Sequence, residues 1–180
     1  EFNVTSTAGN TDVEITALSA PVADHWRRET VGLVFQQFHL FPGLSALENV
    51  LLPLRFDHWS IDPAMRARAL KLLERVGVRP DLDATGLSRG EMQRVAVARA
   101  LLRKPAIVFA DEPTASLDRG TANVVADLLS SMCRSVNATL VVTTHDPMLA
   151  SRLDWAYDIV DGDLRARSPA CECHRLRSVA

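Results

Sequence analysis

The chain has 180 residues, 47% of them hydrophobic and 23% charged, a composition typical of one globular domain and not of a disordered or fibrous protein. Its net charge of -2 lacks the basic surplus that is typical of nucleic-acid-binding proteins, so we expect no nucleic-acid partner. The apolar runs are far shorter than the ~20 residues of a membrane-spanning helix. Three cysteines are too few for a disulfide framework, which favours a reducing compartment.

Residues 1–30 show only weak patterning, and we expect partial disorder before residue 12. The apolar run at 31–36 predicts a buried strand that ends at a pair of glutamines. A loop containing Pro42 and Gly43 follows this strand. We therefore expect the ordered domain to begin at about residue 31.

Residues 45–104 predict three helices without an intervening strand. Two of them begin with a serine followed three residues later by a glutamate, the spacing of a capping box, at Ser45–Glu48 and Ser88–Glu91. The middle helix begins at the pair Asp62-Pro63, a good N-cap and first-turn combination. Pro53 should shorten or kink the first helix. The absence of strands in this stretch indicates a helical subdomain inserted into the fold.

Strands and helices alternate along the rest of the chain. The pattern predicts strands at 106–110, 139–143 and 156–160, a long helix at 120–136, and a short helix that begins at Asp146-Pro147. Alternation of this kind favours a parallel sheet with helices on both faces, so the expected fold class is α/β. We expect residues 31–165 to form the domain, with 1–30 a remnant of a preceding part and 166–180 a tail.

Two acidic residues, Asp111 and Glu112, follow the predicted strand at 106–110. Open α/β sheets bind ligands at such strand ends. The first carboxylate could hold Mg²⁺ and the second could orient or deprotonate an attacking water, as phosphoryl chemistry requires. An isolated Asp-Glu pair is more often a helix cap or a solvated acidic pair, so neighbouring motifs decide between these interpretations.

Further polar groups are predicted near that edge. His145 follows the strand at 139–143, where a neutral imidazole could hydrogen-bond a phosphate or a water. The tetrad Ser88–Glu91 opens a helix whose backbone N–H groups form a potential anion site. The capping box alone would also explain the tetrad.

Together, five segments resemble the ATP-binding cassette (ABC) ATPases in the order that this family shows. They are Phe35-Gln36, Leu87–Arg94, Asp111–Thr114, Ser116–Asp118 and Thr144–Asp146. The resemblance implies a P-loop NTPase-like ABC ATPase core with a mainly parallel sheet and a helical subdomain. For the chemistry, it implies that Gln36 is the Q-loop glutamine near the metal and water, that Asp111 is the Walker B aspartate at the metal, and that Glu112 is the general base. It implies that His145 is the switch histidine and that Asp118 is the D-loop aspartate. The signature loop would consist of Ser88, Arg89, Gly90 and Glu91.

The stretch from Phe35 to Pro42, with Leu47–Val50 and Pro53, looks most like the bacterial branch that includes lipoprotein-release and macrolide-efflux ATPases. This resemblance implies ATP and Mg²⁺ as cofactors. It also implies two partners, a transmembrane permease subunit that contacts the Gln36 loop and a second ABC ATPase domain, identical or not, that pairs head-to-tail. The expected location is the cytoplasmic face of the cell membrane, reached through the permease.

The sequence departs from the family pattern at three points. Arg89 replaces a usual glycine of the signature, and Glu91 replaces its usual glutamine. The third departure is the missing Walker A loop, because the only lysines, Lys71 and Lys104, stand in no Gly-Lys-Ser/Thr sequence. We expect an N-terminally truncated cassette that is inactive alone. The encoding DNA upstream of Glu1 would separate truncation from degeneration.

Two alternatives to a transporter ATPase remain open. In the first, the chain is a non-catalytic module that docks on a membrane partner or supplies its signature loop to an intact cassette. In the second, it is a soluble ABC ATPase with a non-transport task.

Overall fold

The computed structural model describes residues 18–56 and 60–166, which form two units, one up to Thr143 and one from Thr144 onward. The predicted disorder before residue 12 lies outside these residues, as does the tail from residue 167. No helix in the described ranges has the length and apolarity needed to span a bilayer. We call the part up to Thr143 the first unit and the remainder the second unit.

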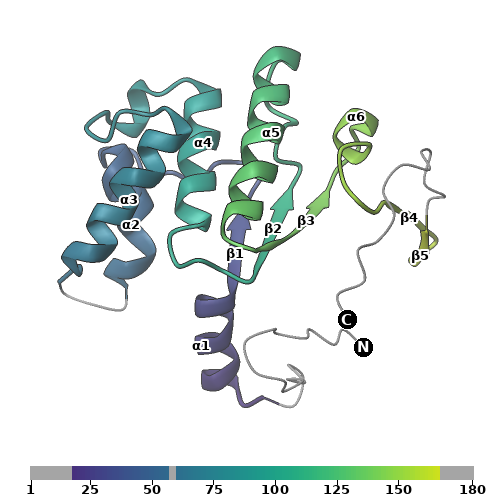
Figure 1. Cartoon of the computed structure of the whole chain (residues 1–180), viewed down its shortest axis with the longest axis horizontal. Helices are drawn as coiled ribbons and strands as arrows, with labels where there is room; N and C mark the ends of the chain where they lie inside the picture. The colour runs from purple at the N-terminus through teal and green to yellow at the C-terminus, as the bar shows by residue number, and fades with distance from the viewer. Residues whose placement is uncertain (1–17, 57–59, 167–180) are drawn as a thin grey trace. The chain divides into compact units, whose positions relative to one another are not determined.

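The first unit contains a parallel sheet of three strands in the order β1 (Val31–Val34), β2 (Ile107–Asp111) and β3 (Thr139–Thr143) (Figure 1). Alternate residues point to opposite faces of a strand. The side chains of Val34, Val108 and Ala110 lie on one face of the sheet and are buried. They belong to the same core cluster as side chains of the helices. The predicted α/β class with a parallel sheet is confirmed for these strands.

The helical part of the first unit consists of α2 (Ala46–Arg55), α3 (Pro63–Val76) and α4 (Arg89–Ala100), with a 3₁₀ turn η2 (Ala84–Gly86) before α4. Both predicted capping boxes are present, at Ser45–Glu48 and at Ser88–Glu91. Pro53 lies inside α2, which ends two residues later. Between residues 46 and 104, the largest side chains with less than 2% exposure are leucines, valines and one glutamine: Val50, Leu51, Leu73, Gln93, Val95, Val97, Leu101 and Leu102.

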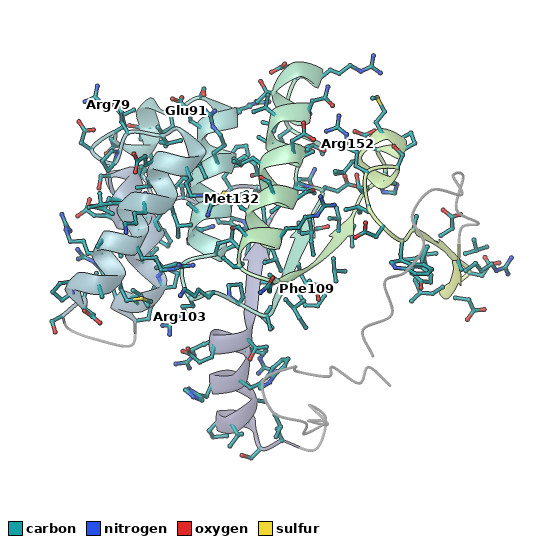
Figure 2. The ribbon with its side chains drawn as sticks, in the orientation of Figure 1. Arg79, Glu91, Arg103, Phe109, Met132 and Arg152 are labelled. Carbon is teal, nitrogen blue, oxygen red and sulfur yellow. The ribbon has the colours of Figure 1, made fainter. Side chains whose placement is uncertain are left out.

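The helix α5 (Arg119–Ser135) packs against both α4 and β3. Its Met132 side chain belongs to the buried core, whereas Phe109 of β2 is exposed on the other face of the sheet (Figure 2). The helix matches the one predicted at 120–136 to within a residue at each end. Its carboxyl end is closed by Val136 and by Asn137, which has a positive φ of 56°.

An additional helix, α1 (Ala20–Thr30), leads directly into β1 and was not predicted. Only Ala23 of this helix is buried, so the sequence has no apolar stripe at helical spacing that could have revealed it. Glu29 near its end pairs with Arg103, in the turn after α4. The ordered chain thus begins earlier than the weak patterning of residues 1–30 indicated.

Two polar side chains fix the loop between β1 and α2. The buried side chain of Asn49 accepts a hydrogen bond from Phe41 N at 2.7 Å and donates to the carbonyls of Phe41, Leu44 and Ser45 at 3.1–3.2 Å. Arg99 of α4 donates to the carbonyls of the preceding loop residues His39 and Phe38 at 2.6 and 2.8 Å. The helical part therefore holds this loop at both ends.

The second unit contains the short helix α6 (Pro147–Ala150) and an antiparallel hairpin of β4 (Tyr157–Val160) and β5 (Asp163–Ala166). The strand at 156–160 was expected to belong with the alternating strands of the parallel sheet, and β5 was not predicted. In the described part of the chain β4 pairs with β5 instead. The cause is the tight turn at Asp161-Gly162, where both residues have positive φ, of 54° and 87°, as hairpin turns require.

Candidate functional site

Ser88 and Glu91 form a closed pair at the amino end of α4. The Ser88 hydroxyl accepts a hydrogen bond from Glu91 N at 3.3 Å, and the Glu91 carboxylate accepts from Ser88 N at 2.9 Å and from Ser88 Oγ at 2.6 Å. These bonds, the one from the Ser88 side chain most of all, lower the pKa of Glu91 below its usual value. Glu91 thus carries a negative charge beside the signature turn, where the family's usual glutamine would be neutral.

Asp118 is the N-cap residue of α5, as Ser88 is of α4. Its carboxylate accepts a hydrogen bond from Thr121 N at 3.1 Å. Hydrogen bonds from the Thr121 side chain and backbone lower the pKa of Asp118. The predicted D-loop aspartate is therefore an N-cap as well as a candidate ligand-binding residue.

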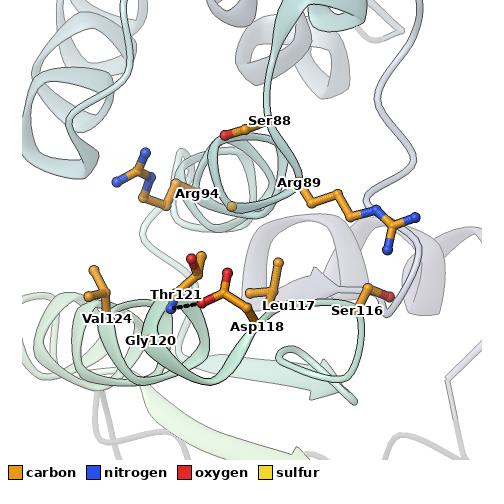
Figure 3. A pocket seen from close by; sticks show the side chains of 10 residues that line it. Ser88, Arg89, Arg94, Ser116, Leu117, Asp118, Gly120, Thr121 and Val124 are labelled. Atoms are coloured by element: carbon orange, nitrogen blue, oxygen red, sulfur yellow. Dashed lines mark hydrogen bonds between the residues drawn. The ribbon is translucent and has the colours of Figure 1, made fainter.

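A cavity of about 630 Å³ separates the amino ends of α4 and α5 (Figure 3). It is lined by three of the four predicted signature residues, by the predicted D-loop and by the first turns of both helices: Ser88, Arg89, Gly90, Arg94, Ser116, Leu117, Asp118, Gly120, Thr121 and Val124. Two motifs that lie far apart in the sequence are thus brought to one site. Among the described residues, the side chains of Arg89 and Arg94 have no hydrogen-bond partner, and Arg94 Nε is buried.

Gly90 explains why the two helices approach so closely. A Cβ atom built on Gly90 would lie 2.5 Å from Cγ2 of Thr121 on α5, well inside any allowed contact. The absence of a side chain at Gly90 therefore lets α4 pack directly against Thr121 of α5, in addition to any role of Gly90 toward a ligand.

The predicted carboxylates stand at the end of β2, as expected. Asp111 Oδ1 accepts a hydrogen bond from the Thr143 hydroxyl of β3 at 2.6 Å, and Glu112 N donates to Thr143 O at 2.9 Å. Glu112 has a positive φ of 42°, which is uncommon for a residue other than glycine. Neither carboxylate residue lines the cavity between α4 and α5.

Gln36 leaves β1 at the carboxyl edge of the sheet, the same edge from which Asp111 leaves β2, because the two strands are parallel. It lines a second cavity of about 500 Å³ between the loop after β1 and the segment from η2 to α4. The lining comprises Gln36, Gln37, Phe38, His39, Leu40, Pro42, Ala84, Thr85, Leu87, Arg89, Met92 and Ser116. Arg89 and Ser116 line both cavities.

His145 belongs to the second unit, between β3 and α6. Its side chain is exposed. The neighbouring Asp146 caps α6 by accepting from Met148 N at 2.8 Å. The role of His145 as a switch histidine stays a prediction.

A family model described as "ABC transporter" matches residues 3–115. The chain belongs to the ABC transporter family. It is 43% identical over 143 residues to the lipoprotein-releasing system ATP-binding protein LolD of Legionella pneumophila strain Paris, which covers 78% of this chain and 63% of that protein. It is also 43% identical over 149 residues to LolD 1 of Caulobacter vibrioides, covering 82% of this chain and 64% of the relative. The chain thus spans less than two thirds of the length of these relatives.

A solved structure supports the fold assignment. The chain resembles the dimeric ATP-binding cassette MJ0796 in a post-hydrolysis state bound to ADP and Pi, with a TM-score of 0.73 and 36% identity. The similarity covers 89% of this chain and 71% of that one. The expected ABC ATPase fold, and the resemblance to the lipoprotein-release branch, are confirmed.

The carboxylates of this ABC family member fit a Mg²⁺ ion that arrives with a nucleotide. Mg²⁺ prefers oxygen ligands and is typically held by one or two carboxylates together with phosphates and waters. Asp111 offers such an oxygen, since its Oδ2 has no hydrogen-bond partner in the described ranges. Those ranges also hold no group of three or more Asp, Glu, His or Cys side chains suited to a metal. The oxygen donors at this strand end therefore fit a metal ion that is bound together with a nucleotide.

The residues that would hold ATP phosphates on this chain are only partly present. Lys71 lies exposed on α3 and Lys104 lies in the turn before β2, and neither lines a cavity described above. Neither lysine stands in a Gly-Lys-Ser/Thr sequence, so neither forms the lysine cradle that holds phosphates in a P-loop.

Sequence reasoning gave no role to three residues that the structure brings to these motifs: Thr121, Arg94 and Thr143. A capping position for Thr121 could have been found, because Asp118 lies three residues before it. Arg94 and Thr143 could not, since their place depends on how α4 meets α5 and on the register between β2 and β3.

Proposed function

We propose that this chain is the signature and Walker B part of an ABC transporter ATP-binding subunit, and that the complete subunit hydrolyses MgATP to drive a membrane permease. The observation that carries this proposal is the cavity that joins Ser88–Gly90 to Ser116–Asp118, two motifs whose combination is characteristic of the family. The similarity to LolD favours a lipoprotein-releasing system and a location on the cytoplasmic face of the membrane.

In the complete subunit, Asp111 would hold Mg²⁺ with the nucleotide phosphates, and the metal would neutralise phosphate charge. Glu112, next along the chain, would accept a proton from the attacking water. Gln36 would contact the metal or the water, and His145 would hydrogen-bond the γ-phosphate. These roles follow from the family resemblance, and the parallel strands support them by directing Gln36 and Asp111 to one edge.

The cavity between α4 and α5 would close on ATP held by a second ABC ATPase domain. The first N–H groups of α4 and the cation of Arg89 both favour an anion. The Glu91 carboxylate opposes it, but that charge is engaged by two hydrogen bonds from Ser88. Arg89 thus compensates for the charge that replaces the usual glutamine.

The second cavity is the proposed docking groove for the permease. Its walls are mainly apolar, with Phe38, Leu40, Leu87 and Met92 among the lining residues. Asn49 and Arg99 hold the loop on one side of the groove by backbone hydrogen bonds, as described above. A groove that is formed in advance loses little conformational entropy when a partner binds.

The experiment mixes the 180-residue chain with purified LolD of Legionella pneumophila and measures association by sedimentation velocity with and without MgATP. We expect a complex that depends on ATP, because the second domain supplies the lysine cradle and this chain supplies the signature. Arg89→Glu should weaken the complex, whereas the matched change Arg134→Glu, at the far end of α5, should not.

The chain alone should hydrolyse ATP at a negligible rate. Association that ignores ATP, or that Arg134→Glu weakens as much as Arg89→Glu, would contradict the proposal. The missing Gly-Lys-Ser/Thr sequence also favours the alternative of a non-catalytic partner for an intact cassette. That alternative predicts that the mixture hydrolyses ATP only at the site of the relative.

A further inference from the structure

One residue, Thr143 at the end of β3, contacts both members of the Asp-Glu pair. Asp111 and Thr143 are register partners in the parallel pair of β2 and β3. The Thr143 hydroxyl donates to Asp111 Oδ1 at 2.6 Å, and the Thr143 carbonyl accepts from Glu112 N at 2.9 Å. Thr143 therefore binds the side chain of the first carboxylate residue and the backbone of the second.

The hydroxyl bond does not serve to satisfy a buried group, because both Asp111 and Thr143 are exposed. An O–H···O⁻ bond of this length is charge-assisted and stronger than a bond between neutral groups. The Thr143 side chain has only a few staggered χ1 rotamers, and the bond to Asp111 favours the one that directs the hydroxyl at the carboxylate. The bond occupies Oδ1 and leaves Oδ2 of Asp111 as the oxygen available to a cation.

The backbone bond acts on the residue that departs from ordinary geometry. Glu112 has a φ of 42°, a conformation that persists only where its surroundings hold it. The bond from Glu112 N to Thr143 O is one such constraint, and the bond from Ala115 N to Glu112 O at 3.2 Å is another. The direction in which the chain leaves β2 thus depends on β3.

We infer that Thr143 is a positioning residue that orients Asp111 toward a phosphate-bound divalent cation and holds Glu112 next to it. The inference rests on the proposed function, since it needs a cation at Asp111. It goes beyond that function, because none of the five family motifs includes Thr143. Thr143→Val keeps the β-branched shape and removes only the hydroxyl, and Thr143→Ser keeps the hydroxyl.

The first measurement needs no nucleotide. Three-bond couplings to the Thr143 methyl group, measured by NMR, report its χ1 rotamer. We expect a single rotamer in the parental chain and rotamer averaging in Asp111→Ala, where the acceptor is gone. Averaging in the parental chain would overturn the inference, since the hydroxyl would then not hold the carboxylate.

The second measurement uses the chain joined upstream to the Gly-Lys-Ser/Thr segment of the Legionella relative, so that ATP can be held. It titrates Mn²⁺ in the presence of ATP and follows paramagnetic broadening of the Asp111 and Glu112 amide signals. Loss of a group that orients a metal ligand typically costs about 10- to 100-fold in metal affinity, so Thr143→Val should weaken Mn²⁺ binding by about 10-fold. Thr143→Ser should retain the parental affinity. Thr139→Val, the matched change at the other end of β3, should retain it too, with unchanged thermal unfolding in all three variants.

The outcomes separate the two proposals. If Thr143→Val binds Mn²⁺ as the parental chain does while Asp111→Asn does not, the positioning role is wrong and the metal assignment stands. If the joined chain with Thr143 and Asp111 intact shows no broadening at Asp111, the metal assignment of the proposed function fails and the positioning role fails with it.

Discussion

The helical part and the sheet of the first unit differ in how completely their apolar side chains are covered. In the helical part, Leu73 of α3 and Leu101, which follows α4, have no exposed surface, and most of the core lies between α2, α3 and α4. In the sheet, Leu33, Phe109 and Val141 form one register row across β1, β2 and β3 and are 46%, 43% and 40% exposed. Parallel sheets are usually covered on both faces, and the described residues cover one.

We infer from this difference that the helical part and the sheet contribute differently to the protein. The helical part supplies most of the buried core and holds the loop after β1, so its contribution is to stability and to positioning. The sheet brings the predicted chemistry to its carboxyl edge, where Asp111, Glu112 and Gln36 leave the strands. Substitutions in the helical part should therefore lower the free energy of unfolding, whereas substitutions at the carboxyl edge of the sheet should change nucleotide binding and hydrolysis.

The largest expected effect concerns the sheet edge, in a chain joined upstream to the Gly-Lys-Ser/Thr segment of the Legionella relative. Removing a general base typically costs about 10²- to 10⁴-fold in rate, so Glu112→Gln should lower single-turnover hydrolysis by that factor. Nucleotide affinity should be retained or increased, because one negative charge near the γ-phosphate is removed. Asp111→Asn should instead weaken Mg²⁺-dependent binding as well as turnover.

Nucleotide affinity, single-turnover rates and urea unfolding of both variants check this assignment. Hydrolysis by Glu112→Gln at the parental rate would show that Glu112 is not the base. A large loss of unfolding free energy in either variant would contradict the separation of chemistry from stability.

The second effect compares one substitution in the two regions. Leu73→Ala removes a side chain with no exposed surface, and such changes typically cost about 2–5 kcal/mol in unfolding free energy. Leu33→Ala removes the same atoms from the exposed face of β1. It should cost less than about 1 kcal/mol in unfolding free energy, because the deleted atoms are already partly exposed to water in the folded chain. Equal losses in urea unfolding would mean that the exposed face is covered in solution.

The smallest effect tests the contact between the signature turn and α5. Gly90→Ala places a methyl group against Thr121, and overpacking of this kind typically costs about 1–3 kcal/mol. Adding Thr121→Ser removes the Cγ2 atom that clashes and should restore part of the unfolding free energy. Gly86→Ala is the control, because nothing lies within 4 Å of a Cβ there. Similar losses for both glycines would show that backbone flexibility, and not the close approach, is responsible.

The sequence alone determined the elements whose signals are local. Capping boxes at Ser45 and Ser88, the proline at the start of α3 and the apolar runs of the three sheet strands depend on spacing within one segment, and all appear where predicted. The family motifs were equally readable, because each is a short run of residues. The exception among local signals is α1, whose exposed surface gives no apolar stripe.

Tertiary structure alone decided which of these segments meet. The cavity between Ser88 and Asp118 depends on a glycine that lets α4 approach α5, and the contact of Thr143 with Asp111 depends on strand register. The pairing of β4 with β5 was likewise hidden, since it follows from the turn at Asp161-Gly162 and not from the alternation of elements. Distances between residues far apart in the chain are set by packing and pairing, which no local pattern encodes.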